Sequence, residues 1–318
     1  MSEKVSKALR LIDLLADLPA PLLAQLAKFS MLRQIRAGET IFCQGEPAPY
    51  CFGILSGQIK IQRVPREKEF PPKILSVLGP GSLFGEQALF KESPRTAMAV
   101  ASQNGELVAI QGKQFRDWIE QDLTAGVPLL MGMLQNTIAR LRQTSHELSV
   151  VYGVDRFLAS DKPIKDRLHE TADFLRASLE DVDELIIYQR NPYWEEFEPL
   201  VHVGAAAPGA EGSGPAALPI THPLVKQVAA MMRPVVVSDT KDALTALVPL
   251  IDSHDSQHPL LGFLWAQSKA NSRAFSPNIL LLLESVSVQL MEALLRHHRQ
   301  EDQEAQSRLH QSRQSFSL

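Results

Sequence analysis

The stretch that decides the fold of the first half of the chain is FGEQALFKESPRTA, residues 84–97. Gly85 opens a short segment of helical pattern, where a residue without a Cβ lets backbone N–H groups approach an anion closely. Arg95 comes ten residues later and can clamp phosphate oxygens with two hydrogen bonds. Glu86 only accepts hydrogen bonds when ionised, which suits a sugar hydroxyl. The stretch predicts a sugar-phosphate site, with an ordinary turn glycine and two solvated charges as the alternative.

Short runs of β-branched and aromatic residues lie on both sides of this stretch and are separated by turn residues. They predict strands at residues 40–42, 51–55, 58–64, 74–78, 96–100 and 106–110. Such a series of short strands is typical of an all-β sandwich or barrel. Before the strands, leucines spaced by three and four residues over 9–34 predict two short helices, broken at Pro19 and Pro21.

Helical spacing returns after the strands, first over residues 113–120 and then in a long helix over about 127–148. An apolar seam runs along the long helix at intervals of three or four, through Leu130, Leu134, Thr137, Leu141, Thr144 and Leu148. The seam fits pairing with the same helix of a second chain, and it equally fits packing on its own sandwich. Both interpretations can hold along different parts of one helix.

In this order and at this spacing, the pieces resemble the cyclic nucleotide-binding domain that catabolite activator proteins share with the regulatory subunits of cyclic-nucleotide-dependent kinases. The resemblance covers residues 12–148 and is carried by GETI (38–41), QGE (44–46), FGILSG (52–57) and the stretch 84–97. It implies a β-jelly-roll domain with flanking helices that binds a cyclic nucleotide.

The resemblance also implies a role for each residue of the cassette. Gly85 and the backbone after it, including Gln87, would hold the cyclic phosphate. Glu86 would accept a hydrogen bond from the ribose 2′-hydroxyl, and Arg95 would contact the exocyclic phosphate oxygens.

The identity of the base depends on residues outside the cassette. Thr96 stands where a hydroxyl can bond guanine, yet the activator proteins carry a similar hydroxyl there and prefer cAMP. Thr144 and Ser145 fall where the resembled helix offers a Thr-Ser pair to the adenine amino group, although such a pair is also common on an ordinary helix surface. We therefore expect cAMP as the ligand, with cGMP as the alternative.

The second half departs from the activator proteins, which continue into a helix-turn-helix that enters the major groove. Residues 1–160 carry 18 Lys and Arg against 15 Asp and Glu, whereas residues 161–318 carry 14 against 21. Neither half has the basic excess expected of a nucleic-acid surface. Nucleic-acid binding is therefore not expected.

Helices and strands alternate in the second half. We expect helices at residues 164–179, 223–232 and 277–299, strands at 184–189, 197–203, 234–238, 246–251 and 260–267, and a frayed polar tail at 301–318. The order of elements, with RPVVVSD (233–239), LGFLW (261–265) and AFS (274–276), resembles a GAF domain, a small-molecule sensor and dimerisation module. A PAS-like domain is the competing fold. Between the first two strands, we interpret Tyr193 and Trp194 as aromatics that cover a sheet edge, with a partner-binding knob as the alternative.

The predicted fold class is thus α+β, with two domains. Residues 1–125 form the cyclic nucleotide-binding domain, 126–160 a connecting and dimerisation helix, 161–300 a GAF-like α/β sheet domain and 301–318 the polar tail. Two cysteines are too few for a disulfide framework and lack the partners of a zinc site.

Apolar runs stay below the ~20 residues that span a bilayer, and MSEKVSKALR at the N-terminus lacks the apolar core of a signal peptide. The sequence contains no G-x-S-x-G, Walker A or H-E-x-x-H pattern. We therefore expect a cytoplasmic, non-enzymatic signalling protein without metal or cofactor. It would be a homodimer that binds a cyclic nucleotide and signals to a protein partner through its second domain. A transcription regulator with an unrecognised DNA contact, a scaffold with a non-binding pocket and an enzyme with cryptic nucleotide turnover are the alternatives.

Overall fold

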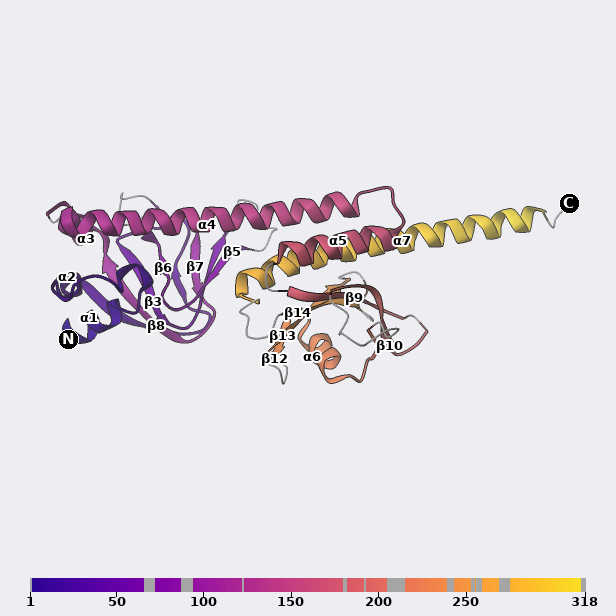
Figure 1. Ribbon diagram of the computed structural model, residues 1–318, viewed down its shortest axis with the longest axis horizontal. Helices are drawn as coiled ribbons and strands as arrows, with labels where there is room; N and C mark the ends of the chain where they lie inside the picture. The colour runs from indigo at the N-terminus through magenta and orange to yellow at the C-terminus, as the bar shows by residue number, and fades with distance from the viewer. Residues whose placement is uncertain are drawn as a thin grey trace. The chain divides into compact units, whose positions relative to one another are not determined.

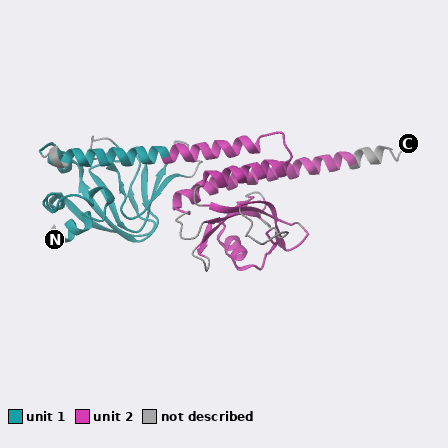
Figure 2. Ribbon diagram, in the orientation of Figure 1, with its two compact units in different colours: residues 1–142 teal, residues 143–318 magenta. Residues whose placement is uncertain are grey.

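The computed structural model divides into two units, residues 1–142 and 143–318 (Figure 2). It describes residues 2–65, 72–86, 94–121, 123–179, 182–191, 193–204, 215–238, 243–252, 255, 259–268 and 275–315. The candidate ligand residue Gln87 lies outside these ranges. The division falls inside one long helix, α4 (Leu123–Leu158), so the expected connecting helix contributes to both units.

The first unit is built on two four-stranded antiparallel sheets, with strand orders β1-β8-β3-β6 and β2-β7-β4-β5 (Figure 1). Phe52 and Phe84 from one sheet and Phe42 from the other belong to the apolar cluster between them. The expected β-sandwich is therefore confirmed. Its strands are β1 (Ser30–Ile35), β2 (Thr40–Phe42), β3 (Tyr50–Ser56), β4 (Ile59–Arg63), β5 (Lys73–Leu78), β6 (Leu83–Phe84), β7 (Met98–Ala101) and β8 (Gly105–Gln111).

Two of these strands, β1 and β6, were not predicted. The expectation that helix extends over residues 30–34 is wrong, because β1 pairs with β8 continuously from Ser30 opposite Ile110 to Ile35 opposite Gly105. Pairing with β8 satisfies the backbone N–H and C=O groups of every second residue in the segment. These hydrogen bonds outweigh the helical preference indicated by the leucine spacing. The two-residue β6 pairs with β3 and leads directly into Gly85.

The helices of the first unit form a second apolar cluster at one end of the sandwich. They are α1 (Ser2–Leu9), η1 (Asp13–Leu15), α2 (Ala20–Leu26), η2 (Ala27–Phe29) and α3 (Gly112–Gln121). Leu129 and Met133 place the first part of α4 in the same cluster. The seam residues Leu134 and Leu141 on another side of α4 are 52% and 66% exposed. One face of α4 thus packs on its own domain, while the seam is open within this chain.

A six-stranded antiparallel sheet, ordered β11-β10-β9-β14-β13-β12, forms the centre of the second unit (Figure 1). The strands are β9 (Val182–Arg190), β10 (Glu196–Gly204), β11 (Leu218–Pro219), β12 (Val235–Ser238), β13 (Leu244–Ile251) and β14 (Leu260–Ser268). The expected second sheet unit is confirmed, and only the short β11 lies outside the predicted strands.

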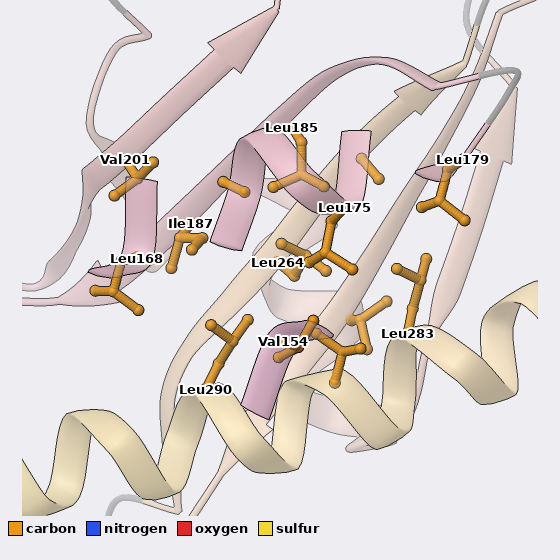
Figure 3. Packing of buried hydrophobic residues seen from close by; sticks show 14 of the residues in the cluster. Val154, Leu168, Leu175, Leu179, Leu185, Ile187, Val201, Leu264, Leu283 and Leu290 are labelled. Carbon is orange, nitrogen blue, oxygen red and sulfur yellow. The ribbon is translucent and has the colours of Figure 1, made fainter. Parts of the chain in front are cut away.

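Helices cover both faces of this sheet: α5 (Ile164–Ser178), α6 (Pro223–Met231) and α7 (Pro277–Ser315). On one face, Leu175 of α5, Leu290 of α7 and Val154 of α4 pack against strand residues such as Ile187 and Leu264 (Figure 3). On the other face, Val225 and Val228 of α6 belong to a separate cluster with Phe263.

The last helix, α7, runs further than the predicted 277–299 and includes residues 301–315, so the expectation of a frayed tail from residue 301 is wrong. Among the described helices, its segment Pro277–Arg308 is long and apolar enough to cross a bilayer by length and composition. Of the apolar window in this segment, 39% is buried, and Leu283, Val286 and Leu290 belong to the core of the second unit.

The turn between β9 and β10 presents its aromatic side chains to solvent. Tyr193 is 88% exposed and Trp194 is 68% exposed, so the interpretation that they cover a sheet edge is wrong. The Asn191 side-chain oxygen accepts hydrogen bonds from the backbone N–H groups of both residues, at 2.8 and 3.2 Å. This Asx-type turn fixes the backbone with both rings outward.

Candidate functional site

Gly85 occupies the turn that leaves β6, and its backbone has φ of +67°. A Cβ at this position would lie 2.5 Å from Arg95 Nη1. A side chain is therefore disfavoured both by the left-handed backbone and by the guanidinium beside it. The sequence-predicted pair Gly85 and Arg95 is brought together in the structure.

Arg95 is held by its backbone as well as by its side chain. Its N–H donates to Glu46 O and its carbonyl accepts from Gly45 N, both at 2.8 Å. Nη1 donates to Gly85 O at 3.1 Å and Nη2 donates to Tyr50 O at 2.5 Å. The guanidinium also stacks on the ring of Phe42. These contacts fix the orientation of the Arg95 side chain.

The Arg95 guanidinium is unusually buried for an arginine, with the residue 6% exposed. Burial lowers the pKa of Arg95, and the nearby groups Cys51, Glu46 and Glu86 act in the opposite direction. Nε of Arg95 is buried without a hydrogen-bond partner among the described residues. A buried cation with a spare donor is stabilised by an anion placed beside it.

Arg95 and Gly85 line a cavity of about 140 Å³ within the first unit. Its polar lining includes the carboxylate of Glu86, the exposed Thr96 and the guanidinium of Arg140. The complete lining is Phe42, Ala48, Ile61, Ser76, Leu78, Phe84, Gly85, Glu86, Pro94, Arg95, Thr96, Ala97 and Arg140. Two guanidinium groups against one carboxylate favour an anion in this cavity.

Sequence reasoning missed Arg140. Its Nη1 lies 3.4 Å from Glu86 Oε1, and its Nη2 donates to Leu83 O at 2.6 Å. The signal was available in the helical spacing, because Arg140 follows the buried Leu129 and Met133 on one face of α4.

Two predicted ligand residues, Thr144 and Ser145, are not among the residues that line the cavity. Both are exposed on α4 and belong to the second unit. Their expected contact with a base stays a prediction.

A larger hollow of about 640 Å³ lies between the N-terminal helical segment and α4. It is lined by Leu14, Leu18, Leu22 and Leu129 among other residues, with Asp13 and Asp17 as its charged groups. Carboxylates repel phosphate, so the smaller cavity with two guanidinium groups is the better anion site.

Cys51 is buried and Cys43 is exposed, and both are free thiols. Within the described residues, no group of three or more His, Cys, Asp or Glu side chains could hold a metal ion.

Comparison with known proteins identifies the domain that holds this cavity. Residues 32–122 match the family of the cyclic nucleotide-binding domain. The CRP-like cAMP-activated global transcriptional regulator of Mycobacterium tuberculosis is 33% identical over 120 residues, which is 37% of this chain and 50% of that protein. The cyclic AMP receptor protein of Thermus thermophilus is 32% identical over 115 residues, 36% of this chain and 50% of that protein.

Among solved structures, the sensor domain of the transcriptional regulator DNR from Pseudomonas aeruginosa is 27% identical, covering 45% of this chain and 92% of that chain with a TM-score of 0.38. The chain spans about half the length of the curated relatives it matches. Residues 32–122 are thus a cyclic nucleotide-binding domain, and this match ends before the second unit begins at residue 143.

Proposed function

We propose that this protein is a cytoplasmic, non-enzymatic regulator that binds a cyclic nucleotide, with cAMP preferred over cGMP. The observation that carries the proposal is the buried guanidinium of Arg95, which faces Gly85 and shares a cavity with Glu86 inside a cyclic nucleotide-binding domain. A cyclic phosphate is the anion that this domain family takes, and its single negative charge suits the cavity.

In the proposed complex, the cyclic phosphate lies against Arg95 and the backbone at Gly85. The Phe42 ring and the carbonyls of Tyr50 and Gly85 already hold the guanidinium, so little side-chain entropy is lost on binding. Glu86 accepts the sugar hydroxyl. The base then lies toward the more apolar part of the lining, beside Ile61 and Leu78.

The preference for cAMP rests on two lines of support. The two relatives compared above are described as a cAMP-activated regulator and a cyclic AMP receptor protein. Thr144 and Ser145 also form a hydroxyl pair on α4 that could meet an adenine amino group. Thr96 is compatible with either base, because a hydroxyl both donates and accepts hydrogen bonds.

The output proposed for the ligand runs through α4 and the second unit. Leu129 packs α4 into the first unit, and Val154 packs the same helix into the core of the second. We propose that the chain is a homodimer joined along the exposed seam of α4. The antiparallel sheet, with α5 and α7 on one face and α6 on the other, supports a GAF-like unit that contacts a protein partner.

Isothermal titration of the full chain with cAMP, and separately with cGMP, tests the ligand. The matched variant is Arg95→Ala, and loss of one phosphate clamp should weaken micromolar binding by about 10²-fold or more. Binding of cAMP that is abolished in the variant would support the proposal. Absence of heat with either nucleotide, in folded protein free of co-purified ligand, would refute it.

Transcription regulation is the second candidate, because the similar protein of Mycobacterium tuberculosis is described as a transcriptional regulator. The acidic balance of residues 161–318, with 14 Lys and Arg against 21 Asp and Glu, counts against a DNA-binding second half. A gel shift with random duplex DNA at low salt, with and without cAMP, separates the two. Retarded DNA would favour the second candidate over a protein partner.

A further inference from the structure

The larger hollow of the first unit, about 640 Å³ in volume, lies between the N-terminal helical segment and α4. That volume is in the range of cavities that take whole small molecules. Its walls are mainly apolar, with Leu14, Leu18 and Leu22 on one side and Leu129 on the other. The described residues that line it are all different from those that line the cavity of Arg95. The hollow is therefore a separate candidate site, independent of the proposed function.

The charged groups of the hollow are carboxylates. Asp13 and Asp17 are four residues apart, and so are Leu14 and Leu18 directly after them, so an acidic edge runs beside an apolar wall. Both aspartates are exposed, and within the described part of the chain neither makes an ion pair. Among the described residues that line the hollow, none is basic. The hollow therefore favours a cation over an anion.

The loop that leads into β6 holds Asp13 in place. The Asp13 backbone N–H donates to Gly81 O at 3.0 Å. Gly81 has φ of +87°, and a Cβ there would lie 2.5 Å from Asp13 Oδ1. Because glycine has no Cβ, the carboxylate can lie directly against this backbone. One of the two acidic groups is thus positioned by the fold before any ligand enters.

The hollow and the exposed seam of α4 lie on different sides of the helix. Gly132 and Gln135 line the hollow, whereas Leu134 belongs to the seam and is 52% exposed. Around the helix, Gly132 is about 200° and Gln135 about 100° from Leu134. A second copy paired along the seam would therefore leave the hollow open. Together with its volume, this favours a small molecule as the occupant over a second copy of the chain.

We propose that this hollow is a second ligand site, which binds a small amine with an apolar tail. The tail lies against Leu18 and Leu129, where it buries apolar surface on both walls. The ammonium group lies at the acidic edge formed by Asp13 and Asp17. An ammonium has three donors, and the two carboxylates together with the side-chain oxygen of Gln135 supply acceptors for them.

The experiment compares three probes that share one phenylbutyl skeleton: 4-phenylbutylamine, 4-phenylbutanol and 5-phenylpentanoate. At pH 7 their end groups are cationic, neutral and anionic. Ligand-observed NMR titration of the full chain measures the Kd of each. The amine should bind with a Kd of about 0.1–1 mM, because so small a ligand buries little area. The alcohol should bind about fivefold and the anion at least about tenfold more weakly than the amine, because exposed charge pairs contribute modestly.

Two variants locate the bound probe. Asp17→Asn should weaken amine binding about three- to fivefold and leave alcohol binding unchanged, since only the amine carries a charge. Leu18→Phe enlarges a wall residue and should weaken both probes by about tenfold. The matched controls are Asp117→Asn on α3 and Leu11→Phe, which make the same changes at exposed positions outside the lining. Both controls should bind the probes as the wild type does.

Thermal unfolding of each variant checks that it is folded, and Leu22→Phe replaces Leu18→Phe if the latter is not. Equal binding of the three probes by the wild type would refute the role of the carboxylates. Amine binding that Asp17→Asn and the phenylalanine variant both leave unchanged would place the probe elsewhere and refute the site. A chain that binds cAMP and none of the three probes would refute this inference and leave the proposed function standing.

Discussion

The guanidinium carbon of Arg95 lies 3.9 Å from the centroid of the Phe42 ring. Phe42 ends strand β2, and its ring packs in turn 6.0 Å from the rings of Phe52 and Phe84. The cation of the site therefore rests on the aromatic core of the sandwich. Stacking of this kind orients a guanidinium plane without using its hydrogen-bond donors. The orientation of the Arg95 guanidinium is therefore set by the core of the sandwich.

Arg95→Lys should separate the contribution of the positive charge from that of the guanidinium geometry, in both stability and ligand affinity. Lysine keeps the positive charge but cannot stack on Phe42 while donating to the carbonyls of Tyr50 and Gly85. We expect the free energy of unfolding of the first unit to fall by about 1–3 kcal/mol, because two buried acceptors lose their donors. The affinity for cAMP should fall by about 10²-fold. Urea unfolding and isothermal titration measure the two effects.

The control for this substitution is Arg63→Lys, at an exposed position at the end of β4. It should change the free energy of unfolding by less than about 0.5 kcal/mol. An Arg95→Lys protein as stable and as tightly bound to cAMP as the control would show that only the charge matters.

Gly85→Ala should damage the site through the backbone. At φ of +67°, a Cβ would stand 2.5 Å from Arg95 Nη1, so alanine strains the turn and displaces the guanidinium. We expect a loss of about 1–2 kcal/mol in the free energy of unfolding and at least a tenfold loss in cAMP affinity. Gly79→Ala is the matched control, because a Cβ there meets nothing within 4 Å. Equal effects of the two substitutions would contradict the prediction.

Leu134→Glu and Leu141→Glu should dissociate the proposed homodimer. The two side chains are 52% and 66% exposed in the single chain, and each would place a carboxylate in the apolar seam of the partner helix. Loss of one buried leucine together with burial of a charge should weaken dimerisation by about 10²-fold or more. Sedimentation velocity over a range of protein concentrations measures the change.

The control for the seam is Ala139→Glu, an exposed position on the far side of α4. It adds the same charge to the same helix and should leave the dimer intact. A wild-type chain that sediments as a monomer, or a dimer that survives both leucine substitutions, would exclude this seam as the interface.

Much of the fold follows from local patterns, for reasons visible in particular residues. The predicted strand at 40–42 coincides with β2, and the predicted helix at 164–179 differs from α5 by one residue. Gly38 and Gly45 flank the first segment and Pro163 precedes the second, so these limits are indicated by nearby residues. Strand β1 was missed because its partner β8 is distant in sequence, and pairing of that kind leaves no local signal.

The candidate site shows the same contrast between residues close in sequence and contacts between distant elements. Gly85, Glu86 and Arg95 belong to one short stretch, and the resemblance of the surrounding segments to a cyclic nucleotide-binding domain predicts that they form one site. Arg140 reaches Glu86 from another element. Helical spacing places Arg140 on the same side of α4 as Leu129 and Met133, but the sequence around it does not indicate that this side meets the stretch 84–97. Tyr193 and Trp194 illustrate the converse, because aromatic character suggested burial while the turn made by Asn191 directs both rings outward.

The second unit should lose stability in alkaline solution through Tyr188. This residue is 3% exposed on β9, its hydroxyl donates to Ala216 O at 3.3 Å, and burial raises its pKa from 10 to about 12, with the charge of Glu184 adding to the shift. The folded chain therefore keeps the phenol proton at a pH where the unfolded chain has lost it. The contribution of Tyr188 to the free energy of unfolding is present in full below pH 10. It is lost as the pH rises toward 12, which lowers the free energy of unfolding by about 1–3 kcal/mol.

Tyr188→Phe removes this titration, so the test is a difference between two proteins. Urea unfolding followed by tryptophan fluorescence at pH 9 and pH 11 should show a larger alkaline loss for the wild type than for the variant. Other tyrosines and lysines titrate in the same range, and they cancel because both proteins carry them. Tyr193→Phe, at the 88% exposed turn position, should follow the wild type. Identical alkaline losses in the wild type and Tyr188→Phe would mean that the phenol of Tyr188 reaches water in the folded unit, and that the sheet face covered by α6 is open there.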